Sequence, residues 1–197
     1  MEFFIVKRTS PQLLEEMRRH YSAPKGFVGR NICYAIIEGG HCYGHIVAGS
    51  ATRFLPGRDD FLRCKAIKKL NKIANNIFYH IEPKDGEYPM RNFATKVLEL
   101  FEKQIVGDWK KKYGDSLIAL ETLIELPRTG ECYRRAGWTK VGQTKGFTCK
   151  RAAGKGTDNW TGKRVWHTKN LRPKLVFIKK VNQLLNSSSS QGKSGAA

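Results

Sequence analysis

The stretch that decides the fold is GECYRRAGWTKVGQT, residues 130–144. Its spacing predicts a short amphipathic helix that carries Tyr133, then a tight turn at residues 136–138, and then a strand. A glycine followed by an aromatic residue is common where a helix turns into a strand. Taken alone, the pattern therefore favours Tyr133 and Trp138 as core aromatics, and the rest of the chain decides whether it also indicates a site.

Patterns typical of strands and helices alternate before this stretch. The predicted strands cover residues 3–7, 32–38, 42–51, 77–82 and 117–125, and the predicted helices cover residues 11–20, 59–73 and 93–109. Ser10 and Pro11 are favourable residues for starting the first helix, and Gly39 and Gly40 predict a tight hairpin. The alternation predicts the α/β class, with a mixed sheet that is covered by helices on both faces.

The chain has 197 residues, of which 40% are hydrophobic, and this is enough for one core. We expect a core domain over residues 1–150 and a basic extension packed on it over residues 151–185, with strands near 164–167 and 174–179. Residues 186–197 contain the polar run SSSSQGKSGAA, which cannot bury apolar surface, and we expect this tail to be disordered.

The sequence also sets expectations about the compartment. No run approaches the eighteen or so apolar residues of a membrane span, and the first residues do not resemble a secretory signal. Five cysteines, an odd number without a CxxC pair, indicate reduced structural thiols. We therefore expect a cytoplasmic protein with no membrane partner.

Charge is the strongest signal in the composition. Thirty-six Lys and Arg against seventeen Asp and Glu give a net charge of +19, and residues 140–180 hold twelve basic residues against one acid, Asp158. A solvated surface, a ribosome-like tail and an anionic membrane surface are the alternatives, but interleaved basic and aromatic residues favour nucleic acid. The residues expected to contact DNA are Lys163, Arg164, Lys169, Arg172, Trp160, Trp166 and His167.

The order of elements over residues 2–150 resembles the GNAT acyltransferase fold. In that class a tyrosine, a Gly-aromatic pair and a strand form half of the acyl donor site, which implies that Tyr133 lies at the reacting centre. Within the superfamily the chain resembles the phage Mom family of DNA-modification proteins. The matching segments are Arg19-His20-Tyr21-Ser22, Gly130-Glu131-Cys132-Tyr133 with Gly137-Trp138, and Trp166-His167-Thr168.

The Mom resemblance implies transfer of a carbamoylmethyl-type group to the N6 amine of adenine in DNA, which protects phage DNA from restriction in the host cytoplasm. An adenine within a duplex would have to be flipped out first. The run at 130–146, with the apolar segment 175–178, is also similar to DruA-like proteins of anti-phage systems. A non-catalytic DNA-binding protein and a GNAT enzyme acting on RNA or protein amines therefore stay open as alternatives.

The resemblance places candidate catalytic residues in three segments. Tyr133 is the candidate general acid or positioning hydroxyl, and Glu125 is the candidate base, with Glu121 as a competing choice. His20 and Tyr21 are assigned to the active site, although a histidine at a helix C-terminus also suits simple capping. Imidazole and phenolate both suit iron, so this pair is also the candidate metal site, which His45 could join.

The donor site departs from the GNAT pattern. The family holds the pyrophosphate of coenzyme A on a Gln/Arg-x-x-Gly-x-Gly/Ala loop at a helix N-terminus. Residues 82–95 read EPKDGEYPMRNFAT and lack the paired glycines. Arg91, Asn92 and Thr95 remain the candidate anion-binding residues. Acetyl-CoA or another small acyl donor stays open, as does a homodimer.

Overall fold

The computed structural model describes residues 1–20, 26–146, 148–151, 164–167 and 172–181, with the backbone alone at 148–151 and 164–167. Seven strands form the main sheet, in the order β1-β2-β3-β4-β5-β9-β6. Their bounds are β1 Glu2–Val6, β2 Asn31–Glu38, β3 His41–Ser50, β4 Ile73–Ile81, β5 Ala119–Glu125, β6 Thr139–Gln143 and β9 Lys174–Lys180. Only β4 and β5 pair in parallel, so the predicted mixed sheet is confirmed.

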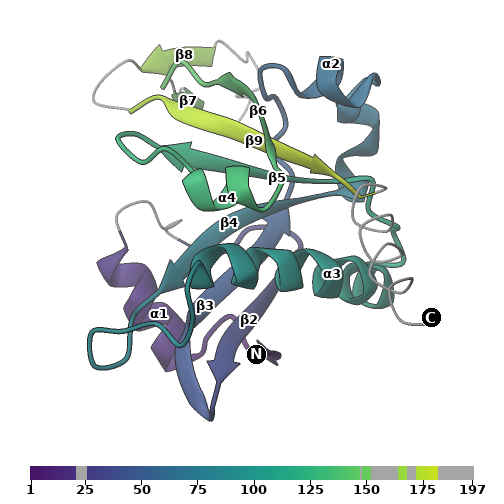
Figure 1. Ribbon diagram of the computed structural model, residues 1–197. Helices are drawn as coiled ribbons and strands as arrows, with labels where there is room; N and C mark the ends of the chain where they lie inside the picture. Colours follow the sequence, from purple (N-terminus) through teal and green to yellow (C-terminus); the bar gives the residue numbers. More distant parts are fainter. Residues whose placement is uncertain (21–25, 147, 152–163, 168–171, 182–197) are drawn as a thin grey trace, which may run out of the picture.

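Helices cover both faces of this sheet. They are α1 Pro11–Arg19, α2 Arg58–Leu62, the 3-10 helix η1 Ala66–Lys72, α3 Phe93–Tyr113 and α4 Glu131–Arg135. Figure 1 shows α3 and α4 crossing one face. Leu13 of α1 packs against Cys33 and Val47, which alternate with the residues beneath α3, so α1 lies on the opposite face.

Helix α3 packs a row of apolar side chains on its face of the sheet. Phe101, Ile105 and Trp109 recur at helical spacing and are almost fully buried against β2 and β3. The indole of Trp109 donates to the carbonyl oxygen of Asn71 at 3.2 Å, which attaches η1 to the helix. Each large apolar side chain buried in this way stabilises the fold by about 1.5–3 kcal/mol.

The predicted helix over residues 59–73 is divided in two. Helix α2 ends at Arg63, which adopts a left-handed conformation with a φ of 52°. The N–H groups of Arg63 and Cys64 donate back to the carbonyl oxygens of Asp60 and Asp59, which closes the helix. Hydrophobic spacing alone did not reveal this break, because the apolar residues continue at helical intervals on both sides of it.

Residues 174–180 form strand β9, which belongs to the main sheet and not to an extension packed on it. These residues were grouped with an extension, but β9 lies inside the sheet between β5 and β6. Leu175 through Ile178 are all buried, as expected for a strand that is covered on both faces. The nearby strands β7 Thr148–Arg151 and β8 Arg164–His167 pair with each other in a separate two-stranded sheet.

The parallel strands β4 and β5 are paired only at their beginning. Their register runs from Ile73 opposite Ala119 to Asn76 opposite Thr122. The hydroxyl of Thr122 donates to the carbonyl oxygen of Asn76 at 3.0 Å at this last pair. Ile77 is an extra residue in the β3–β4 ladder, a β-bulge that increases the local twist of β4. Beyond it the two strands diverge.

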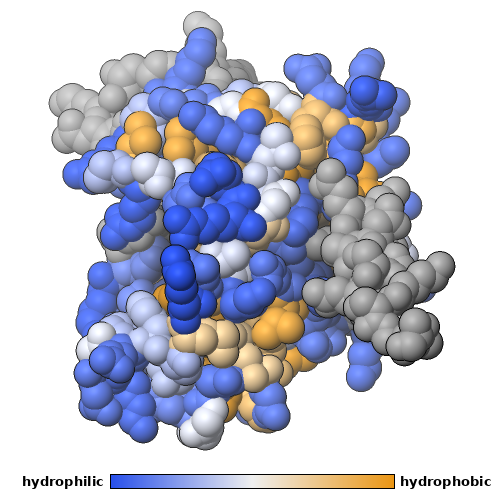
Figure 2. All heavy atoms as spheres, in the orientation of Figure 1, coloured by the Kyte–Doolittle hydropathy of each residue, from blue (hydrophilic) through white to orange (hydrophobic). Residues whose placement is uncertain are grey.

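The surface agrees with the composition. On the face shown in Figure 2, hydrophilic residues predominate and the hydrophobic residues form separate small areas. No helix in the described part of the chain is both long and apolar enough to cross a membrane.

Candidate active site

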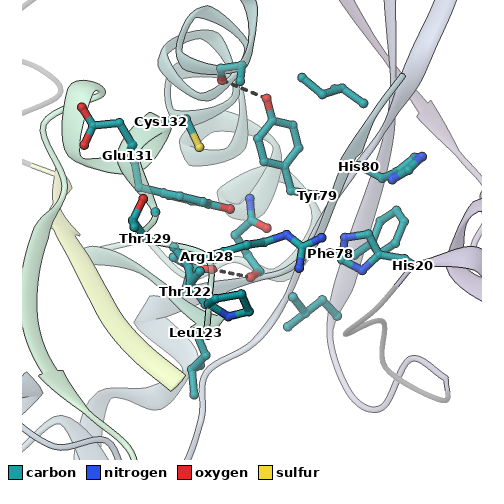
Figure 3. Close-up of a pocket in the computed structure, with 18 of the residues that line it drawn as sticks. His20, Phe78, Tyr79, His80, Thr122, Leu123, Arg128, Thr129, Glu131 and Cys132 are labelled. Atoms are coloured by element: carbon teal, nitrogen blue, oxygen red, sulfur yellow. Dashed lines mark hydrogen bonds between the residues drawn. The ribbon is translucent and has the colours of Figure 1, made fainter. Parts of the chain in front are cut away.

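A cavity of about 770 Å³ lies where β4 and β5 diverge (Figure 3). From the face that carries α3 and α4 it is lined by Ala94, Cys132 and Tyr133. From the face that carries α1 it is lined by Arg19 and His20. The cavity therefore joins the two faces of the sheet, and two molecules could meet in it from opposite sides.

Gly130 allows α4 to begin close to β5. Its φ is +72°, and a Cβ atom there would lie 2.5 Å from Cδ1 of Ile124, so only glycine fits. The helix that follows places Tyr133 at the cavity with 6% of its surface exposed. The ring packs edge-on against Trp138, with centroids 5.1 Å apart. Tyr133 is thus a core aromatic and also a cavity residue.

A buried polar cluster behind Tyr133 fixes the turn after α4. Lys179 of β9 donates to the carboxylate of Glu102 and to the carbonyl oxygen of Ala136, and the indole N–H of Trp138 also donates to Glu102. Burial raises the pKa of the Glu102 carboxyl, and the contacts with Lys179 and Trp138 oppose this rise. These contacts hold Trp138, and through it Tyr133, in one arrangement.

Cys132 and Tyr79 complete this side without ionising. Burial is the main cause that raises the pKa of the Cys132 thiol, and burial also raises the pKa of the Tyr79 hydroxyl well above its ordinary value. Tyr79 donates its hydroxyl to the carbonyl oxygen of Ala94 at 2.8 Å. Both groups keep their protons at neutral pH, which makes Cys132 a poor nucleophile.

His20 is the central residue of the α1 side. Its ring packs edge-on against Phe78 at 4.9 Å and against His80 at 5.6 Å, measured between ring centroids. Burial, together with electrostatic repulsion by His80 and Arg128, lowers the pKa of His20 to about 4. His20 is therefore a neutral imidazole at pH 7 and can accept a hydrogen bond.

His80 and Glu82 continue from His20 toward solvent. The Nε2 atom of His80 lies 2.9 Å from Oε1 of Glu82, and a guanidinium nitrogen of Arg19 lies 3.1 Å from the same oxygen. The hydrogen bond from His80 is the main cause that lowers the pKa of Glu82. Sequence reasoning missed this pair. The signal was available, because His80 and Glu82 alternate at the end of a predicted strand and so share one face.

The two candidate bases on β5 do not line the cavity. Glu125 lies 3.7 Å from the ammonium of Lys174, and Glu121 is fully buried, 2.9 Å from a guanidinium nitrogen of Arg58. Glu121 and Glu125 lie on the same face of β5 as Leu123, which does line the cavity, but their carboxylates pair with Arg58 and Lys174 instead. Arg58, which the sequence did not single out, neutralises Glu121.

The described residues do not support the iron site. Among them no group of three or more His, Cys, Asp or Glu is placed to hold a metal ion. Tyr21, the other predicted ligand, lies outside the described residues. His45 is buried and its Nδ1 atom lies 2.8 Å from Oε1 of Glu16, so it belongs to a pair within the α1 face.

A second hollow of about 540 Å³ lies at the start of α3 and is lined by Arg91, Asn92 and Thr95, the three predicted anion-binding residues. The helix has no acidic residue in its first turn and no side-chain cap. Asn92 adopts a φ of 58°, and its side-chain oxygen accepts from Arg135 at 3.0 Å. Free amides next to two arginines suit an anion.

The two hollows are neighbours. Ala94, Glu131 and Cys132 line both of them, so the hollow at the start of α3 adjoins the Tyr133 cavity. An elongated molecule could therefore lie with an anionic end at α3 and its other end beside Tyr133.

The structure tells less about the predicted DNA contacts. Trp160, Lys163 and Lys169 lie outside the described residues, as do the side chains of Arg164, Trp166 and His167. Arg172 is described, and its guanidinium lies 4.0 Å from the carboxylate of Glu125. These assignments stay predictions.

The chain is similar to FeeM, an N-acyl amino acid synthase from uncultured soil microbes, with a TM-score of 0.56 and 12% identity over 94% of this chain and 98% of that chain. Aminoglycoside acetyltransferase AAC(6')-Ib in complex with coenzyme A and kanamycin matches with a TM-score of 0.48 and 12% identity, over 81% of this chain and 71% of that one. Aminoglycoside 6'-acetyltransferase type Ii has a TM-score of 0.46 and 15% identity, over 92% and 97%.

At this identity the FeeM match shows the fold alone. The sheet, its flanking helices and the gap between β4 and β5 define a GNAT-like fold, as the sequence predicted. The comparison with family models and the comparison with curated proteins both found no match. The finer resemblance to the Mom family stays a prediction.

Proposed function

We propose that the protein is an N-acyltransferase that moves an acyl group from a thioester donor to an amine. The observation that carries the proposal is the position of Tyr133. Its side chain lines the cavity between the diverging strands of a GNAT-like fold, beside the hollow at the start of α3. A buried tyrosine could serve packing alone, but the neighbouring hollow favours a reacting centre.

The donor would enter from the α3 side. Its anionic end would bind the free amides at the start of α3 together with Arg91 and Arg135, and its thioester would lie near Tyr133. A coenzyme A thioester has this length and charge distribution. Asn92 adopts a left-handed conformation that glycine adopts most readily, so the missing glycines do not exclude such a donor.

The chemistry is a direct displacement. The lone pair of the amine attacks the thioester carbonyl carbon, the new C–N bond forms, and the C–S bond breaks. The departing sulfur takes a proton, for which the hydroxyl of Tyr133 is the nearest candidate donor, and the amine loses one to neutral His20 or to solvent. Tyr133 regains its proton from solvent, and the products are an amide and a thiol.

We further propose that the amine is the N6 group of adenine in DNA. The net charge of +19 supports a polyanionic acceptor, and so do the segments that resemble the Mom family. FeeM acts on amino acids, so a small amino acid is the competing acceptor. A DNA-binding protein without catalytic activity is the remaining alternative.

The proposal is tested by mass spectrometry of nucleosides from plasmid DNA in cells that express the protein. We expect a modified deoxyadenosine with the wild-type chain and none with Tyr133→Phe, while both bind DNA equally. In parallel, purified protein is mixed with acetyl-CoA and an amine panel, and thiol release is followed. Thiol release without modified DNA would support the acyltransferase and reject adenine as its acceptor. The absence of both thiol release and modified DNA would reject the proposal that the protein is an enzyme.

A further inference from the structure

We propose that Arg128 forms an anion subsite on the α1 side of the cavity, so that the molecule with the accepting amine must also carry a phosphate or carboxylate. This inference rests on the proposed acyl transfer and specifies its substrate class. It does not follow from the GNAT-like fold, because it depends on a side chain in the turn after β5.

Arg128 is placed across the cavity from the donor hollow. Its backbone N–H donates to the carbonyl oxygen of Glu125 at 3.2 Å, which closes the turn after β5. From this turn the side chain reaches toward His20 and Phe78, while Glu131, Cys132 and Thr129 lie on the other side (Figure 3). The guanidinium therefore lies where the second substrate would meet the thioester.

The charges around this point favour an anion. Glu131 is the only carboxylate among the described residues that line the cavity, and Arg134 and Arg135 both bind it, at 2.6 and 2.9 Å. Glu82 lies behind the lining and is held by His80 and Arg19. No carboxylate of the described lining is thus left to hold an ammonium ion, whereas Arg128 adds a positive charge.

The state of His20 agrees with this reading. Burial, His80 and Arg128 together hold the pKa of His20 near 4, so a cation is disfavoured where the amine would lie. Among the described residues, the charged or titratable groups around His20 include Arg19 on α1, His80 and Glu82 at the end of β4, and Arg128 after β5. An acceptor whose amine is neutral and whose anion binds Arg128 satisfies both requirements.

The test compares matched acceptors that differ only in the anion. With acetyl-CoA as donor, deoxyadenosine 5'-monophosphate is compared with deoxyadenosine, O-phosphoethanolamine with ethanolamine, and β-alanine with 3-aminopropanol. We expect the anionic member to be preferred by about tenfold or more in kcat/KM, the effect of one charged hydrogen bond. The first two pairs report phosphate and the third reports carboxylate.

Arg128→Gln should abolish this preference by raising KM for the anionic member to that of the neutral member. Arg128→Lys should keep part of it. Arg18→Gln is the matched control, because Arg18 lies on the same face but pairs with Glu15 in solvent, and it should behave like the wild type. Equal use of neutral acceptors, or a preference that survives Arg128→Gln, would overturn the subsite.

A second readout does not need turnover. The pKa of His20 is followed by NMR during titration with inorganic phosphate and, separately, with acetate. We expect an anion at Arg128 to raise the pKa of His20 in the wild type and to leave it unchanged in Arg128→Gln. If no acceptor is acylated but this shift occurs, the transferase proposal fails and the subsite stands. If neither anion shifts the pKa, the subsite is rejected.

Discussion

The two sides of the cavity are built in different ways. On the α4 side Tyr133 is packed into the core, and the charged groups behind it, Glu102 and Lys179, are nearly buried and bind each other. On the α1 side His20 and Arg128 belong to a polar layer that water reaches. The difference teaches where a substitution should act. Substitutions on the α4 side should act mainly on stability, whereas substitutions of charged groups on the α1 side should act mainly on chemistry.

The largest expected effect comes from the buried carboxylate on the α4 side. Glu102→Ala leaves the ammonium of Lys179 buried without its partner and should lower the free energy of unfolding by about 3–5 kcal/mol. The matched control is Glu99→Ala, one turn earlier on the same helix, where an exposed pair with Lys96 is removed at a cost of about 0.5 kcal/mol. Urea unfolding measures both, and equal shifts would contradict the comparison.

The next effect separates chemistry from packing at Tyr133. Tyr133→Phe keeps the ring contacts and should lower the rate of acyl transfer about 100-fold or more, as expected for the loss of a general acid. Tyr113→Phe is the control, because its hydroxyl binds the backbone of Asn31 away from the cavity. This control should lose about 1 kcal/mol of stability and keep its activity. If both variants kept their activity, Tyr133 would be a packing residue.

On the α1 side, the titration of His20 should make the free energy of unfolding depend on pH. His20 binds a proton near pH 6.5 in the unfolded chain but only near pH 4 in the folded protein. Between these pH values the unfolded state binds more protons than the folded state, so the free energy of unfolding rises with pH. The contribution of neutral His20 to stability is therefore complete above pH 6.5 and is lost as the pH falls toward 4. Urea unfolding at pH 7, 5.5 and 4 should show this slope, and His20→Gln should reduce it, while His41→Gln leaves it in place.

The smallest expected effect lies at the point where the two strands part. Thr122→Val removes the hydroxyl that binds the carbonyl oxygen of Asn76 and should cost about 1 kcal/mol of stability. Thr139→Val, at an exposed position of β6, should change the stability by less than about 0.5 kcal/mol. If Thr122→Val left the stability unchanged, this hydrogen bond would not stabilise the pairing of β4 and β5 where the cavity begins.

The parts of the fold that could be predicted from the sequence are those with a local sequence pattern. The helix α3, the β2–β3 hairpin and the α4 turn carry their own periodicity and glycines, so the sequence placed them well. The position of β9 depends on pairing with β5, from which it is separated by a long stretch of chain, and no local pattern encodes that pairing. The break at Arg63 was also not predictable from local pattern, because the helical spacing of apolar residues continues on both sides of its left-handed conformation.

The site was predictable to a similar degree. Tyr133 follows from its motif and lines the cavity, whereas Glu125 was chosen from the family resemblance and its carboxylate pairs with Lys174 outside the cavity lining. His20 and Arg128 come together only when α1 and the turn after β5 are brought to the same end of β4, which requires the complete sheet.

The place of β9 also has a consequence for biosynthesis. Strand β5 leaves the ribosome well before β9, its partner along the whole length from Ala119 to Glu125. Until β9 emerges, the backbone on that edge of β5 is exposed and can pair with another chain. The nascent protein therefore passes through a stage prone to aggregation, and a chain truncated before Lys174 would stay in it.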